Sequence, residues 1–117
     1  MKTAAVKTTD AADLAHRMRA DVAVQVWNVL DDEWFNGELI PGSKRVPLSG
    51  LERAVRESSL ASSAAVVVYC AGPACPFSRA AAEKLESLGY SNVLAFEGGL
   101  EEWKKAGHGV MGTAERG

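Results

Sequence analysis

The fold is decided by the stretch at residues 64–79, which reads AAVVVYCAGPACPFSR. Residues 66–69 form a short apolar run rich in β-branched side chains, the pattern of an interior strand in a parallel sheet. A glycine and two prolines then interrupt regular structure, and a helical pattern begins at Phe77 or Ser78. The stretch therefore predicts a buried strand, a tight loop and a helix in direct succession.

Cys70 stands at the carboxyl end of that strand, just before the helix. The N-terminus of a helix supplies unpaired N–H groups and partial positive charge, and both stabilise a thiolate. The position therefore suits a reactive cysteine. The alternative is that Cys70 is a small buried hydrophobe that closes the strand.

In the rest of the sequence, predicted strands alternate with predicted helices. Strands are expected at residues 23–29, 44–46 and 93–96, and helices at 10–19, 33–35, 51–55, 78–88 and 100–106. Thr9 is the expected N-cap of the first helix. Such alternation predicts an α/β fold, with a mostly parallel central sheet and helices on both faces.

Parallel sheets of this kind bind ligands beyond the carboxyl ends of their strands. Three loops should meet at that edge: residues 28–32, 71–76 and 97–99. Cys70 lies at the same edge, where chemistry is expected. The three tryptophans are expected to be core or pocket-wall residues: Trp27, Trp34 and Trp103.

Composition narrows the class of protein. The 117 residues suit one domain over 1–117, with a frayed tail at about 112–117. The net charge of −2 and the absence of a basic cluster argue against nucleic acid and membrane partners. No signal peptide or membrane span is recognisable. Two cysteines and two histidines suit a reducing cytoplasm and no metal site.

Several short motifs, spread over both halves of the chain, carry a resemblance to a known family. They lie at residues 32–37, 40–42, 46–48, 67–70, 80–85, 88–93 and 97–107. The combination resembles the rhodanese-like (sulfurtransferase) domain in its single-domain form. The resemblance covers nearly the whole chain and implies the three-layer α/β fold of that family.

The resemblance also implies a chemistry. Cys70 would carry sulfane sulfur as a persulfide, taken from thiosulfate or a persulfide and passed to cyanide or a thiol, either a small molecule or a protein. The implied substrate-binding residues are Ala71, Gly72, Pro73, Ala74 and Cys75, whose backbone amides would cradle the sulfur, and Arg79. No metal or organic cofactor is implied, and a monomer is expected.

The chain departs from the family pattern at the loop. Residues 71–77 contain no cation, whereas many family members place an arginine or lysine there, and the loop is longer than the common form. Where the family has an aspartate and an arginine after the first strand, this chain has Trp27, Asn28 and Val29. A dianion such as thiosulfate normally calls for positive charge at its site.

Three other functions fit parts of the pattern. Cys70 and Cys75 could form a dithiol redox pair, although the Cys-x-x-Cys spacing of thioredoxin-like proteins is absent. A phosphatase or arsenate-type enzyme would need an arginine closing the loop, where Cys75 and Pro76 stand. A non-catalytic module could carry a persulfide. Cys75 could bond to Cys70, receive its sulfur, or be only a small loop residue.

Overall fold

The computed structural model describes residues 6–20, 24–35, 37–73 and 75–112. The helices are α1 (Ala11–Ala20), α2 (Leu51–Ser58), α3 (Phe77–Ser87) and α4 (Gly99–Lys105), with a 3-10 turn, η1 (Leu48–Gly50), before α2. The strands are β1 (Gln25–Asn28), β2 (Glu38–Leu39), β3 (Lys44–Arg45), β4 (Val66–Tyr69), β5 (Val93–Phe96) and β6 (Met111–Gly112).

The central sheet is parallel and has the order β3-β1-β4-β5. In its register, Val68 of β4 pairs with Trp27 on one side and with Ala95 on the other. All four residues of β4 are buried, as the apolar run predicts for an interior strand. The predicted parallel α/β architecture is confirmed.

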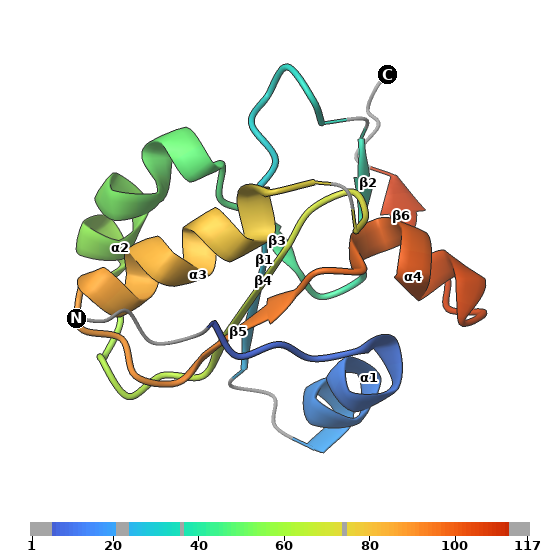
Figure 1. Cartoon of the computed structure of the whole chain (residues 1–117), viewed down its shortest axis with the longest axis horizontal. Helices are drawn as coiled ribbons and strands as arrows, with labels where there is room; N and C mark the ends of the chain where they lie inside the picture. Colours follow the sequence, from blue (N-terminus) through green and yellow to red (C-terminus); the bar gives the residue numbers. More distant parts are fainter. Residues whose placement is uncertain (1–5, 21–23, 36, 74, 113–117) are drawn as a thin grey trace.

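The two faces of the sheet are covered by different helix pairs (Figure 1). Val66 and Val68 pack with residues of α2 and α3, whereas Val67 and Tyr69 pack with residues of α1 and α4. Successive strand side chains point to opposite faces, so one short run of β4 contributes to both cores.

Two short strands form a second sheet that the sequence analysis did not foresee. β2 and β6 pair antiparallel, with Leu39 opposite Met111. Each strand has only two residues, too few to show the alternation by which a strand is recognised. The pairing places Gly112 in a strand, and residues 113–117 of the expected tail lie outside the described residues.

Two local expectations were wrong. Asp10, rather than Thr9, caps α1, because its carboxylate accepts the Asp13 N–H at 2.8 Å, while the Thr9 N–H pairs with the Ala95 carbonyl of β5. The expected helix at 33–35 is a single turn in which the Trp34 and Phe35 amides reach the Asp31 carbonyl. No helix among the described residues is long and apolar enough to cross a membrane.

Candidate active site

The cysteine loop joins β4 to α3 and begins with Cys70, whose side chain is fully buried. The Cys75 N–H donates to the Gly72 carbonyl at 3.0 Å, which closes a tight turn. Pro73 follows the glycine, in the position where proline favours such turns. The turn reverses the chain, so Cys75 comes back toward Cys70.

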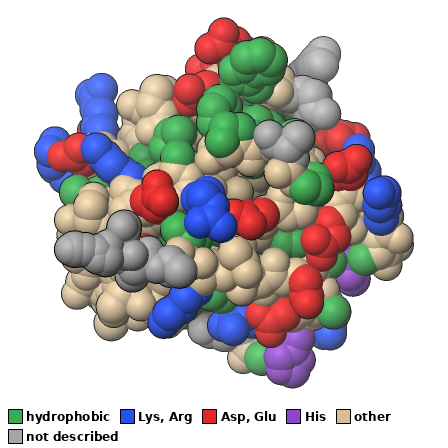
Figure 2. All heavy atoms as spheres, viewed as in Figure 1, with side chains coloured by type: hydrophobic (Ala, Val, Ile, Leu, Met, Phe, Trp, Pro, Cys, Tyr) green, Lys and Arg blue, Asp and Glu red, His purple; other side chains and the backbone are tan. Residues whose placement is uncertain are grey.

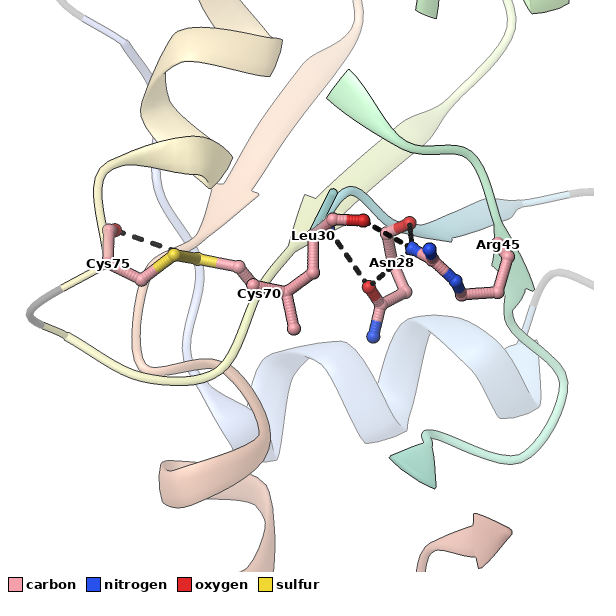
Figure 3. The surroundings of a disulfide bond; sticks show 5 residues. All are labelled: Asn28, Leu30, Arg45, Cys70 and Cys75. Atoms are coloured by element: carbon pink, nitrogen blue, oxygen red, sulfur yellow. Dashed lines mark hydrogen bonds between the residues drawn. A yellow bond between two sulfur atoms is a disulfide. The ribbon is translucent and has the colours of Figure 1, made fainter. Parts of the chain in front are cut away.

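Cys70 and Cys75 are joined by a disulfide bond (Figure 3). Their Cα atoms are 6.5 Å apart, within the range of Cα separations found for disulfides. The Cys75 carbonyl oxygen also lies 3.6 Å from the Cys70 sulfur. The sequence separation alone left this pairing open, and the turn at Gly72 produces it.

The loops that follow β4 and β5 are held together by main-chain hydrogen bonds. Leu100 donates its N–H to the Cys70 carbonyl at 3.0 Å, and Glu101 donates to the Ala71 carbonyl at 2.9 Å. The donors belong to the first turn of α4, whose free amides are natural partners for carbonyls. The predicted meeting of these loops at the sheet edge is confirmed.

The amides available to a sulfur in this loop are fewer than the sequence suggested. Pro73 has no N–H, the Cys75 N–H is used inside the turn, and Ala74 lies outside the described residues. The first turn of α3 adds donors, because no side chain caps it: its N-cap residue is Pro76. Among the described residues, Ala71, Gly72 and the start of α3 keep amides that could serve the predicted cradle, which stays a prediction.

A pocket of about 780 Å³ opens beside the loop. Its apolar walls are Leu30, Trp34, Pro76, Phe77 and Leu100, and the loop contributes Ala71, Gly72 and Cys75. Trp34 is 62% exposed, unlike the buried Trp27 and Trp103. Figure 2 shows hydrophobic side chains gathered at the top of the view, over the segment between β1 and β2 and the start of α3.

Charge around the pocket is predominantly acidic. Of the described lining residues, Glu38 and Glu101 are acidic and Lys104 is basic, and Lys104 pairs with Glu38 at 2.9 Å. Arg79, the predicted substrate-binding cation, is not among the lining residues, and its guanidinium pairs with Glu97 at 2.9 Å. Its role at the site stays a prediction.

The segment after β1 is fixed by Arg45 from β3. The guanidinium donates to the Leu30 carbonyl at 2.5 Å and to the Asn28 side-chain oxygen at 3.3 Å, and it stacks over Phe35 at 4.0 Å. Asn28 is buried and also accepts the Leu30 N–H at 3.0 Å. These contacts position Leu30 as a pocket wall, and the sequence analysis did not assign Arg45 any role.

Tyr69, next to Cys70, ties β4 to the turn before β3. Its hydroxyl accepts the Ile40 N–H at 3.0 Å and lies 2.7 Å from the Ser43 hydroxyl. Burial raises the pKa of Tyr69 above its usual value of 10.0, although the hydrogen bonds from Ser43 and Ile40 oppose the shift. The tyrosine is thus a neutral structural support for the cysteine.

Ser78 is a further residue that the sequence did not single out. It lies in the first turn of α3, is fully buried, and its hydroxyl has no hydrogen-bond partner among the described residues. No cluster of three or more potential metal-ligating side chains occurs in the described part of the chain.

A comparison with protein-family models identifies a rhodanese-like domain over residues 10–106. This chain belongs to the rhodanese-like domain family. A search of curated proteins found no match. The family match confirms the resemblance that the motifs in both halves of the chain carried.

Solved structures agree with this assignment of the rhodanese-like chain. A protein from Bacillus halodurans is 31% identical, with a TM-score of 0.80 over 92% of this chain and 77% of its own. A crystal structure of an Anabaena protein is 30% identical, with a TM-score of 0.79 over 92% and 83%. A thiosulfate sulfurtransferase from Pseudomonas aeruginosa shares the fold at 22% identity and a TM-score of 0.79, over 92% of this chain and 20% of its own.

Proposed function

We propose that this rhodanese-like chain transfers sulfane sulfur through a persulfide on Cys70. The observation that carries the proposal is the place of Cys70: it directly follows the central strand, in the loop that leads to the uncapped N-terminus of α3, and the next residues of that loop, Ala71 and Gly72, line the pocket. Helix N-termini favour negative charge, so this position supports a thiolate. The family supports sulfurtransferase chemistry in general.

The transfer takes two displacements. The Cys70 thiolate attacks the outer sulfur of a donor, the donor's sulfur–sulfur or sulfur–carrier bond breaks, and the donor remnant leaves with the electron pair. An acceptor thiol or cyanide then attacks the outer sulfur, and Cys70 leaves as a thiolate. Because Cys70 is bonded to Cys75, reduction of that disulfide must precede the first step.

The pocket favours an organic persulfide over thiosulfate as donor. Thiosulfate is a dianion and needs positive charge for tight binding. Lys104, the one basic residue among the described lining residues, is paired with Glu38, and Glu101 adds negative charge. The apolar walls at Leu30, Trp34 and Phe77 suit the carbon skeleton of an organic donor.

Intact-mass measurement tests the proposal. The reduced wild type, Cys70→Ser and Cys75→Ser proteins are each incubated with glutathione persulfide or with thiosulfate, and cyanide is then added. We expect Cys75→Ser to gain one sulfur atom and to lose it as thiocyanate, with glutathione persulfide the better donor. Cys70→Ser should gain none. Sulfur uptake by Cys70→Ser equal to that of Cys75→Ser would refute the assignment of Cys70.

The disulfide itself favours a second candidate, a dithiol redox protein that uses Cys70 and Cys75. Such a protein would cycle between the dithiol and the disulfide without taking up sulfur from either donor. A third outcome is a persulfide that forms on Cys70 but is not passed to cyanide or thiols, which favours a non-catalytic carrier. The same mass measurements separate these cases.

A further inference from the structure

We propose that Cys75 is a resolving thiol that converts the sulfane sulfur held on Cys70 into sulfide. The proposal rests on the persulfide of the proposed function and adds a second fate for it. Instead of waiting for an external acceptor, the loaded enzyme releases hydrosulfide and forms the Cys70–Cys75 disulfide. The bond joining these two residues is the product of that step.

The step balances without an outside oxidant. The Cys75 thiolate attacks the inner sulfur, Cys70 Sγ, and a bond forms between the two cysteine sulfurs. The bond from Cys70 Sγ to the outer sulfur breaks, and the outer sulfur leaves as hydrosulfide with the electron pair. The sulfane sulfur is reduced while the two cysteines are oxidised to a disulfide. A low-molecular-weight thiol or dithiol then reduces the disulfide and restores the enzyme.

The loop is built so that Cys75 reaches Cys70 without rearrangement of the core. The hydrogen bond from the Cys75 N–H to the Gly72 carbonyl turns the chain back, and the Cα separation of 6.5 Å suits a disulfide. Gly72 is buried and faces the Glu101 side chain of α4. A thiol tethered by such a short segment has an effective concentration of about a millimolar or more.

The exposure of the two cysteines fits different roles for them. Cys70 is fully buried, whereas Cys75 is partly exposed and lines the pocket. An external reductant can therefore approach Cys75 from the pocket when it reopens the bond. Exchange then starts at the accessible sulfur and leaves Cys70 as the departing thiolate, supported by the start of α3.

A single-turnover experiment tests the inference. Reduced and desalted wild type, Cys75→Ser, Cys75→Ala and Cys70→Ser proteins each receive one equivalent of glutathione persulfide, with no thiol present other than the glutathione that loading releases. Released sulfide is trapped with monobromobimane, and protein mass is measured after acid quenching. We expect the wild type to release one sulfide and to lose two hydrogens. Cys75→Ser and Cys75→Ala should retain the sulfur and release sulfide at least ~100-fold more slowly, since they lack the tethered thiol.

Two outcomes overturn the inference. One is a wild type that holds its persulfide as stably as Cys75→Ser, and the other is equal sulfide release from the two proteins. Both leave the proposed function standing, because Cys75→Ser still loads sulfur. If neither position-75 variant, shown folded by circular dichroism, takes up sulfur, the proposed function fails and this inference fails with it. Cys70→Ser, with Cys75 intact, controls for sulfide released directly by the exposed thiol.

Discussion

The α-carbon of Gly99 faces the main chain of Cys70 so closely that a methyl group added there would lie 2.3 Å from the Cys70 carbonyl oxygen. Gly99 also has a φ of +57°, in the left-handed region that side chains disfavour. The glycine therefore lets the start of α4 sit on the cysteine loop and donate the hydrogen bonds that hold it.

Gly99→Ala should lower the free energy of unfolding by about 2–4 kcal/mol, the combined cost of the left-handed backbone and the clash with main-chain atoms. Urea denaturation of the reduced protein measures it. Gly72→Ala is the matched control: its added methyl meets the carboxylate oxygen of Glu101, a flexible side-chain end, at 2.7 Å. That variant should cost less than about 1 kcal/mol. Equal losses in both variants would contradict this account.

Arg45→Met should destabilise the protein by about 1–3 kcal/mol, because the Leu30 carbonyl loses its charged donor in a partly buried site. The same variant should raise KM for glutathione persulfide, since Leu30 lines the pocket. Asp32→Ala is the control. It removes the ion pair at 2.6 Å between Asp32 and Arg45, but the Asp32 side chain is 92% exposed, so less than about 1 kcal/mol should be lost.

Tyr69→Phe should lower the free energy of unfolding at pH 7 by about 1–3 kcal/mol, because the buried Ile40 N–H loses its acceptor. Ser43 is affected less, since its hydroxyl still donates to the Ile40 carbonyl at 2.6 Å. Thermal melts of the two proteins measure the difference. No difference in melting temperature would mean that water replaces the tyrosine hydroxyl.

Ionisation of Tyr69 should lower the stability of the protein at high pH. Its folded pKa is raised by burial, so its contribution is fully present below the unfolded value of 10.0 and is lost as pH rises through the folded pKa. The gap in melting temperature between wild type and Tyr69→Phe should therefore narrow above pH 10.0. A gap that stays constant through this range would show that Tyr69 does not carry the alkaline loss.

Ala71→Arg should improve the use of thiosulfate. Ala71 is exposed and lines the pocket directly after Cys70, so an arginine there supplies the cation that the loop lacks. A charge-assisted contact contributes about 1.5–3 kcal/mol, which corresponds to a rise of roughly ten- to a hundredfold in kcat/KM for thiosulfate. Glutathione persulfide should gain less, because its two carboxylates lie several bonds away from the reacting sulfur. Ala71→Gln is the neutral control, and an equal gain from it would exclude charge as the cause.

Trp34→Ala should raise KM for glutathione persulfide by about three- to tenfold, because an organic donor loses an apolar wall worth about 1 kcal/mol. Stability should change little, since the indole is 62% exposed. Leu88→Ala removes another exposed hydrophobic side chain, one that is not among the described lining residues of this pocket, and serves as the control. A similar KM for both variants would remove Trp34 from the donor site.

Much of the fold could be predicted from short stretches of neighbouring residues. The β-branched run at Val66–Tyr69 predicted the central strand, and the meeting of the loops after β4 and β5 followed from parallel topology. The predicted N-cap of α1 was wrong because the Thr9 backbone pairs with β5, and the residues next to Thr9 in the sequence do not reveal that contact. The β2–β6 pair was missed for the same reason: its partners lie at distant places in the chain.

The sequence by itself determined the layered α/β fold and a cysteine at the carboxyl end of the central strand, because short-range periodicity and turn residues encode these features. Its motifs also carried the resemblance to the rhodanese-like family, which the family model matched. Only the tertiary structure decided that Cys75 bonds to Cys70, that Arg79 pairs with Glu97, and that Arg45 holds the pocket wall at Leu30. Such pairings depend on how the loops turn and how the strands are registered, which place side chains from separate segments within a few ångströms of each other.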